Sequence, residues 1–588
     1  MAILRRLILT LLVTWGVEGQ HDPLKDFCRR FSHQTAVVDR RLYIDGGFIN
    51  YNPLAQNPVN ESNTNILYAA LDIDNLGMPQ EYNNLSKPST APSVNGGILW
   101  PDTINKLLYL YGGEFSNNTS PPAYSSWVYD IIYNTWNQTV ADPTQSSIQR
   151  ASYGAGVTLQ DRAVGYYYGG WLSNTSVPGW GKAAPLVLSS FLQYDMLQNT
   201  WTNSSGPDSV GRAEGVMVYI PASDRGMLVY FGGVQTSTSA STNATGSGSG
   251  GVIAQGLEDI LLYDIANSKW YSQKATGQIP GDRRRFCGGA TWAQDKSSYN
   301  IYIYGGLSVP TGVGYDDIYI LSIPSFTWIK WYPTTSEAGF PHHSLSCNVI
   351  DGAQMIVMGG TFPNSTACDV PQNYGMHNMD LGKQNSEQKK WIRFRPNVTT
   401  YVVPSEVISV VGGGSTGGAT LTTPTSGFDN PDLQTYFQRV YTPSSRSPTR
   451  AIPTQTGSSN STTSEHQSTH VGAIVGGVVG GVVGAAAIAG ILYWCLRRQK
   501  NTSGERDPPG EIHHEDIKLS DEVEAGQNRW TGGSMATELP DEGSVSGHGN
   551  GQRGSNRWTG QSLGSSELAD ERSGLVGGRQ RGDVAELP

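Results

Sequence analysis

Residues 300–328, NIYIYGGLSVPTGVGYDDIYILSIPSFTW, are the stretch that decides the fold. An apolar run at residues 301–304 is followed at once by the pair Gly305-Gly306. After a loop comes a second run, residues 317–321, and Trp328 ends the unit. Apolar runs of about four or five residues between turn residues are too short for helices. The stretch therefore predicts two buried β-strands with a glycine pair between them.

The same unit recurs along the first four hundred residues. An apolar run precedes each of six glycine pairs, at Gly46-Gly47, Gly112-Gly113, Gly169-Gly170, Gly232-Gly233, Gly305-Gly306 and Gly359-Gly360. In three copies a Trp follows an Asp by six positions, at Asp130/Trp136, Asp195/Trp201 and Asp264/Trp270. One such unit cannot bury both of its faces, whereas copies stacked around an axis can. The repeat predicts an all-β propeller, in which the glycines take positive φ or let a neighbouring backbone approach.

A glycine pair after an apolar strand, followed by spaced Tyr and Trp, resembles the kelch motif, and the resemblance covers residues 28–400. The glycine pairs are farther apart than the roughly 50 residues typical of kelch repeats, which we ascribe to loop insertions such as residues 235–251. The resemblance implies a six-bladed kelch-type β-propeller over residues 20–411, with a seventh blade left open. We expect residues 407–411 to add a last strand to the first blade, beside residues 28–38. An unrelated β-sandwich is the alternative.

Two apolar segments predict that the chain enters the secretory pathway and crosses one membrane. Residues 1–19 combine Arg5-Arg6 with an apolar run and small residues at the end, as in a cleaved signal peptide. Residues 471–496 carry no charge and are long enough to span a hydrocarbon layer of roughly 30 Å. Arg497 and Arg498 follow directly, which places the C-terminus in the cytoplasm. We expect a single-pass plasma-membrane protein with an extracellular N-terminus.

The segments on either side of this span are expected to have no packed core. Residues 412–470 are rich in Gly, Ser, Thr and Pro and predict an exposed stalk, and residues 497–588 predict a disordered cytoplasmic tail. In the tail, Trp530 and Trp558 lie in a short repeat and could each anchor a cytosolic partner. Overlapping G-x-x-x-G steps in the span favour a homodimer through Gly472, Gly476, Gly480 and Gly484.

Glycosylation sequons and cysteines support an extracellular propeller. N-x-S/T sequons occur at Asn60, Asn84, Asn117, Asn118, Asn137, Asn174, Asn203, Asn243, Asn364, Asn397 and Asn460. Oxidising conditions would permit disulfides among the four cysteines that precede the span. Cys347 and Cys368 flank one glycine pair and are the preferred pairing, although four cysteines allow three connectivities.

Basic residues precede the expected innermost strand in most copies. Four arginines do so, and His342-His343 falls near the same position in the sixth copy; the candidate ligand-binding residues are Arg30, Arg150, Arg212, Arg285 and His343. If the blades are equivalent, these side chains converge on one mouth of the central channel as a basic ring. Guanidinium groups there would suit carboxylates, phosphates or acidic sugars. The alternative is that each arginine pairs with a neighbouring loop carboxylate and serves packing.

The sequence offers little evidence for an enzyme. The kelch propeller is similar to that of galactose oxidase, whose copper-radical site needs two Tyr, one of them crosslinked to Cys, and two His. The chain has no Tyr-His dipeptide, and the predicted stalk stands where that family's C-terminal domain, with its last His ligand, would lie. No zinc-type Cys/His spacing or phosphate loop is present. We therefore expect no catalytic residue, metal or cofactor.

Together these features predict a surface receptor-like or adhesion protein whose glycosylated propeller binds an extracellular protein or glycan. The architecture resembles kelch-repeat membrane proteins of filamentous fungi, some of which are labelled cell-wall-anchored. The net charge of −10 argues against nucleic acid as a partner. A copper-radical oxidase and a structural cell-wall or septum component are the alternative functions.

Overall fold

The computed structural model describes residues 21–116, 121–140, 142–237, 251–333, 339–384 and 389–453. The predicted signal peptide, membrane span and cytoplasmic tail lie outside these ranges, and so do Trp530, Trp558 and the four glycines of the span. Within the described ranges, no helix has both the length and the apolar character that a membrane crossing requires. Almost all of the regular structure there is antiparallel β-sheet, as the repeat predicts.

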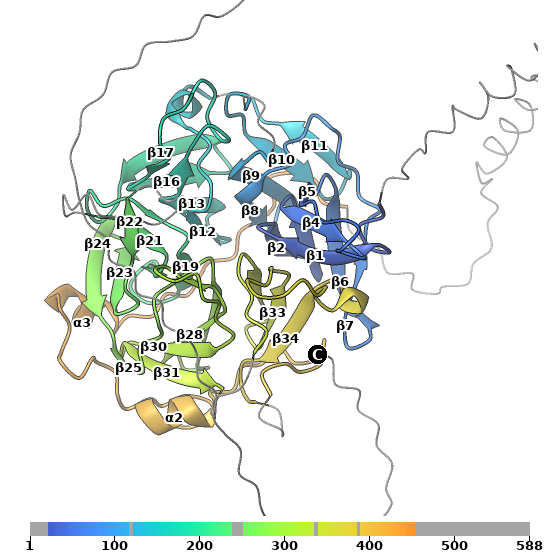
Figure 1. The fold of residues 1–588 in the computed structure, drawn as a ribbon. Helices are drawn as coiled ribbons and strands as arrows, with labels where there is room; N and C mark the ends of the chain where they lie inside the picture. Colours follow the sequence, from blue (N-terminus) through green and yellow to red (C-terminus); the bar gives the residue numbers. More distant parts are fainter. Residues whose placement is uncertain are drawn as a thin grey trace, which may run out of the picture. The chain divides into compact units, whose positions relative to one another are not determined.

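Six of the described sheets succeed one another along the chain and lie around a common centre (Figure 1). The first two consist of β2 (Gln34–Val38), β3 (Arg41–Asp45), β6 (Ile66–Asn75) and β7 (Met78–Tyr82), and of β8 (Asn95–Asp102), β9 (Leu107–Glu114), β10 (Trp127–Asp130) and β11 (Thr135–Gln138). The third consists of β12 (Ala155–Leu159), β13 (Val164–Tyr168), β16 (Ser190–Asp195) and β17 (Thr200–Ser205), and the fourth of β19 (Val216–Ile220), β20 (Met227–Phe231), β23 (Asp259–Asp264) and β24 (Lys269–Lys274).

The last two of these sheets depart slightly from the four-stranded pattern. The fifth has β27 (Cys287–Trp292), β28 (Tyr299–Tyr304), β30 (Ile318–Ile323) and β31 (Thr327–Tyr332), and β25 (Thr276–Gly277) adds to its outer edge in parallel. The sixth has three strands, β32 (Ser346–Ile350), β33 (Gln354–Met358) and β34 (Met376–Asp380). The first strand of each sheet contacts that of the next, and β32 contacts β2, so these strands form a closed circle.

Short sheets lie at the end of the ring where the chain enters each first strand. They are β1 (Phe27–Phe31) with β4 (Phe48–Tyr51) and β5 (Glu61–Ser62), β14 (Trp171–Leu172) with β15 (Leu186–Val187), β18 (Arg212–Ala213) with β21 (Val234–Thr236) and β22 (Val252–Ala254), and β26 (Arg283–Arg284) with β29 (Leu307–Ser308). We call this end of the ring, where the chain enters each first strand, the entry face. The described residues also contain two short 3-10 helices, η1 (Pro143–Ser147) and η2 (Pro371–Asn373).

The glycine pairs join each sheet to the next, which explains why the sequence repeats them. In every copy the N–H of the second glycine donates to a carbonyl of the following sheet at 2.7–2.9 Å. The six donor–acceptor pairs are Gly47–Val94, Gly113–Ala151, Gly170–Arg212, Gly233–Arg283, Gly306–His342 and Gly360–Arg30. Since the last pair returns to the start of the chain, these bonds also form a closed circle.

Gly169 shows why the first glycine of a pair tolerates no side chain. Its φ is +70°, and a Cβ added there would lie 2.0 Å from the carbonyl oxygen of Arg212, the acceptor of the Gly170 bond. Gly181 has the same φ of +70°, but nothing lies within 4 Å of its added Cβ. A comparison of the two positions therefore separates the energetic cost of the left-handed backbone from the cost of the close contact with the Arg212 carbonyl.

We expect Gly169→Ala to lower the free energy of unfolding by about 2–3 kcal/mol, because a left-handed alanine costs about 1–2 kcal/mol and the displaced hydrogen bond about 1 kcal/mol more. Gly181→Ala should lower the free energy of unfolding only by the cost of the left-handed alanine. Urea denaturation of both variants measures the difference. Equal losses of unfolding free energy in the two variants would show that the close approach of the Arg212 carbonyl does not contribute to stability.

The repeated Asp and Trp have distinct structural roles. Asp195 Oδ1 accepts hydrogen bonds from the N–H groups of Leu197 and Gln198, each at 2.9 Å, and so fixes the turn into β17. Trp201, on β17, lies 6.0 Å from Trp100 of the second sheet, measured between ring centroids. Aromatic rings therefore pack between neighbouring sheets, as the repeat predicts.

The predicted closing strand at residues 407–411 is wrong, because that segment is the helix α2 (Ser405–Val411). Val407 and Val411 are four residues apart, so both face the fifth and sixth sheets and are buried there. The N-terminal segment does not extend the sixth sheet either, because β1 pairs with β4. Instead, Thr35 Oγ1 on β2 donates to Asn348 Oδ1 on β32 at 2.8 Å, directly between the first and last sheets.

The predicted Cys347–Cys368 disulfide is also wrong, because the disulfides are Cys28–Cys368 and Cys287–Cys347. Cys347 lies on β32, the innermost strand of the sixth sheet, and faces Cys287 on the neighbouring β27. Cys368 lies in the loop between β33 and β34, beside β1. Both disulfides join residues of different repeat units, so cysteines that are close in sequence within one unit need not be close in the fold.

Residues 412–453, which we call the C-terminal strap, pack on the propeller, so the predicted exposed stalk begins too early. The strap contains α3 (Pro431–Tyr436), whose Leu433 is fully buried among apolar residues of the fourth and fifth sheets. Farther on, Tyr441 accepts a hydrogen bond from Lys296 of the fifth sheet and donates one to Asp161 of the third. Arg446 and Arg450 then form ion pairs with Asp102 and Asp130 of the second.

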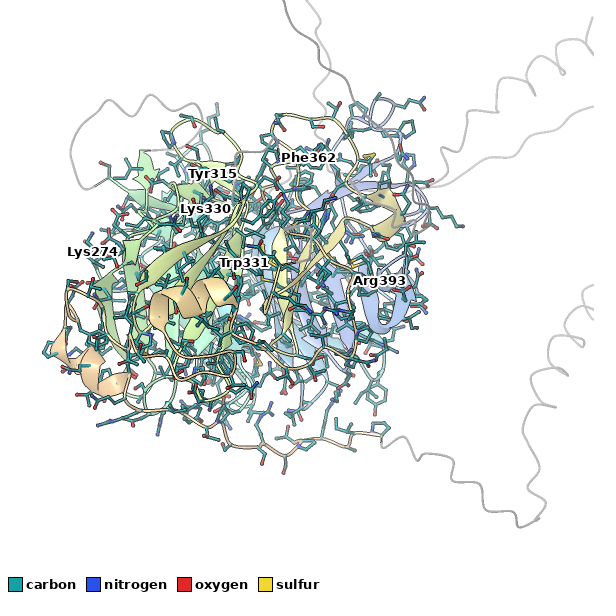
Figure 2. All side chains as sticks on the ribbon, turned by 90° about the horizontal axis from the view of Figure 1, so that it is seen from below. Lys274, Tyr315, Lys330, Trp331, Phe362 and Arg393 are labelled. Atoms are coloured by element: carbon teal, nitrogen blue, oxygen red, sulfur yellow. A yellow bond between two sulfur atoms is a disulfide. The ribbon has the colours of Figure 1, made fainter. Side chains whose placement is uncertain are left out.

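The C-terminal strap lies at the opposite end of the sheets from the entry face. Its partners Asp102, Asp161 and Lys296 lie at or in the turns between the first and second strands of their sheets. Figure 2 shows the strap along one end of the sheets and the loops that carry Tyr315 and Phe362 at the other end. The strap thereby leaves the entry face uncovered.

Candidate functional site

Six residues, one for each sheet, encircle the centre of the entry face. They are Ser32, Gly96, Tyr153, Glu214, Arg285 and Ser344, and we call them the mouth ring. The backbone N–H of each residue donates to the carbonyl of the preceding member at 2.7–3.0 Å. Ser32 donates to Ser344, so this circle of hydrogen bonds closes as well.

Every mouth-ring residue has a left-handed backbone, with φ between 53° and 64°. Five of the six are not glycine, and a non-glycine residue loses about 1 kcal/mol or more in this conformation. The same unfavourable backbone thus occurs at equivalent positions around the circle. Its effect is to align the N–H and C=O groups of the ring and to set one side chain of each entering segment at the channel.

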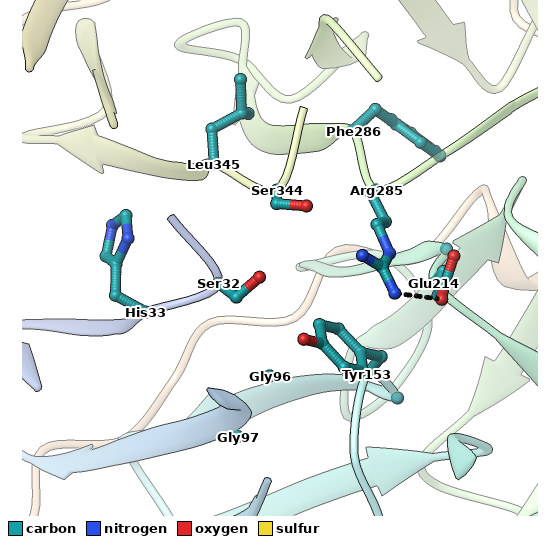
Figure 3. Close-up of a pocket in the computed structure, with 12 residues that line it drawn as sticks. Ser32, His33, Gly96, Gly97, Tyr153, Glu214, Arg285, Phe286, Ser344 and Leu345 are labelled. Atoms are coloured by element: carbon teal, nitrogen blue, oxygen red, sulfur yellow. Dashed lines mark hydrogen bonds and ion pairs between the residues drawn. The ribbon is translucent and has the colours of Figure 1, made fainter. Parts of the chain in front are cut away.

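A cavity of about 140 Å³ lies at the mouth ring, lined by two consecutive residues from each of the six entering segments (Figure 3). Sites for whole small molecules usually have about 300–1,000 Å³. This cavity has room for one protruding side chain or sugar group. Its size therefore favours a larger partner that inserts one group.

Charge at the mouth is concentrated on one side. Arg285 Nη2 donates to Glu214 Oε1 at 3.1 Å, and Arg284 Nη2 donates to the same oxygen at 2.7 Å (Figure 3). Burial alone would raise the pKa of Glu214, but the two guanidinium groups lower it to about 2. Glu214 is therefore ionised at neutral pH, and the three groups together carry one net positive charge.

Arg285 is placed to receive a ligand. Its guanidinium lies over the Tyr153 ring, 4.5 Å from the centroid, and 31% of its side chain is exposed. Its Nε has no hydrogen-bond partner among the described residues. That atom is itself buried, so a ligand can reach only the exposed part of the side chain. Arg285 can therefore offer a charged donor to a carboxylate, phosphate or carbonyl oxygen.

The other predicted arginines do not reach the mouth, so the basic ring does not form. Arg30 has no exposed side-chain surface and pairs with Glu81 at 2.6 Å, and Arg212 keeps 5% and pairs with Asp208 at 2.6 Å. Arg150 is buried, with its guanidinium 4.8 Å from the Phe115 centroid. The alternative prediction, pairing with a neighbouring loop carboxylate, holds for Arg212 with Asp208 and for Arg285 with Glu214, whereas Arg30 pairs with Glu81 on the strand β7.

The basic ring does not form because the arginines at the equivalent position of the repeat are buried and paired, and Arg285 does not belong to that position. The carbonyls of Arg30, Arg212 and Arg283 accept equivalent glycine bonds, so Arg283 is the true counterpart of the other two. Arg283 has no exposed side-chain surface and pairs with Asp317 at 2.6 Å. Arg285 lies two residues farther on, in the mouth ring.

His343 also lies outside the group that lines the cavity. Its backbone pairs with Thr361, and its Nδ1 is 3.0 Å from Ser344 Oγ. Burial and the nearby Arg285 lower the pKa of His343 to about 4, so its imidazole is neutral at physiological pH. It adds no positive charge to the mouth.

The cysteines bear on the alternative of a copper-radical oxidase. Such a site needs a tyrosine crosslinked to a free cysteine. Cys28, Cys287, Cys347 and Cys368 pair with one another, so none of these four described cysteines is available.

The sequon asparagines that the structure describes are all exposed, namely Asn60, Asn84, Asn137, Asn174, Asn203, Asn364 and Asn397. Asn137 and Asn203 lie on the outermost strands β11 and β17. A glycan at any of these positions could stand in water. Asn117, Asn118, Asn243 and Asn460 lie outside the described residues.

Comparison with known proteins identifies a clear relative. The sequence matches no protein-family model. It is 32% identical over 494 residues to a kelch repeat-containing protein of Arthroderma benhamiae, with 71% of this chain and 70% of the relative covered. The solved structure of YjhT aligns at a TM-score of 0.40 and 11% identity, over 59% of this chain and 95% of that one.

Proposed function

Because this chain belongs to the kelch repeat-containing proteins, we propose that its propeller is the binding head of a cell-surface receptor-like or adhesion protein. The partner is a protein or glycan that inserts one acceptor group at the mouth ring. The observation that carries this proposal is the small cavity at the entry face, with the partly exposed side chain of Arg285 in its lining.

The finer architecture belongs to the same proposal. We take the six sheets of the closed circle as the full set of blades, supported by the two closed circles of backbone hydrogen bonds. The signal peptide at residues 1–19, the span at 471–496 and the cytoplasmic tail at 497–588 remain inferences from sequence pattern. Exposed sequon asparagines support an extracellular propeller.

The chemistry of the mouth narrows the partner to one with an oxygen acceptor. Arg285 offers a charged donor, and Ser32 and Ser344 offer hydroxyl groups nearby. Glu214 would repel an anion that came too near, so the ligand must approach the side of Arg285 that faces away from Glu214. An Asp or Glu side chain, or an acidic sugar, meets these conditions.

We expect Arg285→Ala to weaken binding at least about tenfold, since a hydrogen bond to a charged group contributes about 1.5–3 kcal/mol. The measurement is binding of the purified full-length chain to an array of acidic and neutral glycans and of Asp- or Glu-containing peptides. Folding should survive the change, because Arg284 still neutralises Glu214.

The matched control is Arg225→Ala, which removes an exposed arginine from the turn between β19 and β20 at the opposite end of the sheets. It changes the net charge equally and should leave binding unchanged. Equal binding by the Arg285→Ala variant and the parent chain would exclude the mouth as the binding site.

A further inference from the structure

Two histidines and an aspartate meet in the sixth repeat, away from the mouth ring. His342 precedes β32, Asp369 lies between β33 and β34, and His377 lies on β34. All three are buried, and one potential ligand atom of each lies within 4.8 Å of the others. His377 Nε2 is 2.8 Å and His342 Nε2 is 3.4 Å from Asp369 Oδ1. We call these residues the His-Asp-His cluster.

The cluster contains buried polar atoms with unmet bonding capacity. His342 Nε2 and Asp369 Oδ2 have no hydrogen-bond partner among the described residues. His342 and Asp369 keep only 3% and 2% of their surface exposed. Buried polar groups are normally paired, so Asp369 Oδ2, together with His342 Nε2, whose polar neighbour is Asp369 Oδ1 at 3.4 Å, has capacity for a further partner. Both atoms are potential metal ligands.

A chain of hydrogen bonds determines which nitrogen of His342 carries its proton. The Tyr304 hydroxyl donates to Asp316 Oδ1 at 2.6 Å, which uses its only proton. His342 Nδ1 lies 3.1 Å from the same hydroxyl oxygen and must therefore donate to it. In the neutral ring, Nε2 then presents a lone pair toward Asp369. A lone pair facing a carboxylate is repulsive, so either a proton or a metal ion between the two atoms would make this contact favourable.

We propose that His342, Asp369 and His377 bind a divalent transition-metal ion of the zinc class. Imidazole and carboxylate ligands suit such ions, and tetrahedral zinc with ligand bonds of about 2.0–2.1 Å places its ligands roughly 3.3 Å apart. The 3.4 Å between His342 Nε2 and Asp369 Oδ1 is close to that value, whereas the 2.8 Å between His377 Nε2 and Asp369 Oδ1 is a hydrogen bond that a bound metal would replace and lengthen. The Tyr304–Asp316 pair orients His342 as an outer partner orients a metal-bound imidazole.

Aromatic rings and two basic side chains surround the cluster. The Phe362 ring packs on His342 at 4.2 Å, and the Trp391 ring packs on His377 at 4.8 Å, between centroids. Of the nearby cations, Lys390 forms an ion pair with Asp316, and Arg29 donates to the carbonyls of Ala367 and Ser365 and also interacts electrostatically with Asp369.

The ion would hold together the last part of the propeller. Its ligands come from the segment entering β32, the loop before β34 and β34 itself. Asp369 adjoins Cys368, which the disulfide joins to Cys28 in the first repeat. A metal here would therefore stabilise the junction where the end of the ring meets its beginning. This inference does not depend on the proposed binding function of the mouth.

The test begins with the purified full-length chain, from which a chelator removes bound metal. The chain is then allowed to bind zinc and is dialysed. We expect the parent chain to retain about one zinc ion per chain after dialysis, measured by elemental analysis. Tyr304→Phe should weaken zinc affinity about 10–100-fold, because it removes the hydroxyl that orients His342. His377→Ala should abolish retention, because it removes a ligand.

Matched controls separate metal binding from loss of structure. Tyr302→Phe removes a buried hydroxyl from the same strand, one that donates to Leu381 and not to the cluster. His343→Ala removes the neighbouring imidazole, which lies outside the cluster. Both variants should bind zinc as the parent does. A parent chain that retains no zinc, or equal affinity in Tyr304→Phe and Tyr302→Phe, overturns the proposal.

Discussion

Removal of the Cys28–Cys368 disulfide by a double change to alanine is expected to destabilise the propeller by up to roughly 6 kcal/mol. The bond joins residues 340 positions apart, so it closes a loop that contains nearly the whole ring. In the chain-entropy account, a crosslink stabilises by restricting the unfolded chain, and the effect grows with the logarithm of loop length. Urea denaturation under non-reducing conditions measures the loss.

The second disulfide supplies the comparison. Cys287–Cys347 also joins two neighbouring sheets, but its residues are only 60 positions apart, and its removal should cost up to roughly 4 kcal/mol. The order of the two losses is therefore the result that matters. If removing Cys28–Cys368 costs no more than removing Cys287–Cys347, the long crosslink does not hold the ring closed.

Glu81→Gln is expected to lower the free energy of unfolding by about 3–5 kcal/mol, because it leaves the Arg30 guanidinium buried without a counter-ion. The two side chains have no exposed surface, and both terminal nitrogens of Arg30 donate to the Glu81 carboxylate, at 2.6 and 3.1 Å. Arg30 precedes the first strand of the ring, while Glu81 lies on the outermost strand of the same sheet. The urea midpoint of the single variant measures the loss.

Two controls show whether charge or packing is responsible. The double variant Arg30→Met with Glu81→Leu removes both charges and should recover most of the loss, since buried ion pairs can often be replaced by apolar residues. Asp74→Asn breaks the Arg393–Asp74 pair on the same sheet, where 66% and 50% of the side chains are exposed, and should cost about 1 kcal/mol or less. If the double variant is as unstable as Glu81→Gln, the loss of stability comes from altered packing and not from an unpaired buried charge.

The sequence predicted the ring of sheets because its determinants are residue types. The close approach at Gly169 admits only glycine, and the packing at Trp201 needs a large ring, so both leave a visible repeat. Residues 407–411 were misassigned because five apolar or small residues fit a strand as well as a short buried helix. Residues 412–453 were misassigned because their contacts are ion pairs and isolated anchors such as Leu433, which leave no periodic pattern.

The mouth ring was missed because its members share a backbone conformation and no residue type. Ser32, Tyr153 and Arg285 have similar φ values, but nothing in their side chains marks them as equivalent. Glycine follows the ring residue in three copies, at Gly97, Gly154 and Gly215, which is the only sequence signal and a weak one. The His-Asp-His cluster is equally hidden, because its ligands come from segments that only the folded sixth sheet brings together.

The route of the C-terminal strap has a mechanical consequence. A pulling force applied beyond residue 453 would first load the ion pairs of Arg450 with Asp130 and of Arg446 with Asp102, and then Tyr441. The two ion pairs lie on the second sheet, and Tyr441 contacts the third and fifth sheets, so tension would break these contacts one after another before it reached the hydrogen bonds between strands. The entry face lies at the far end from this attachment, so tension on the chain would leave the mouth ring intact while the strap yields.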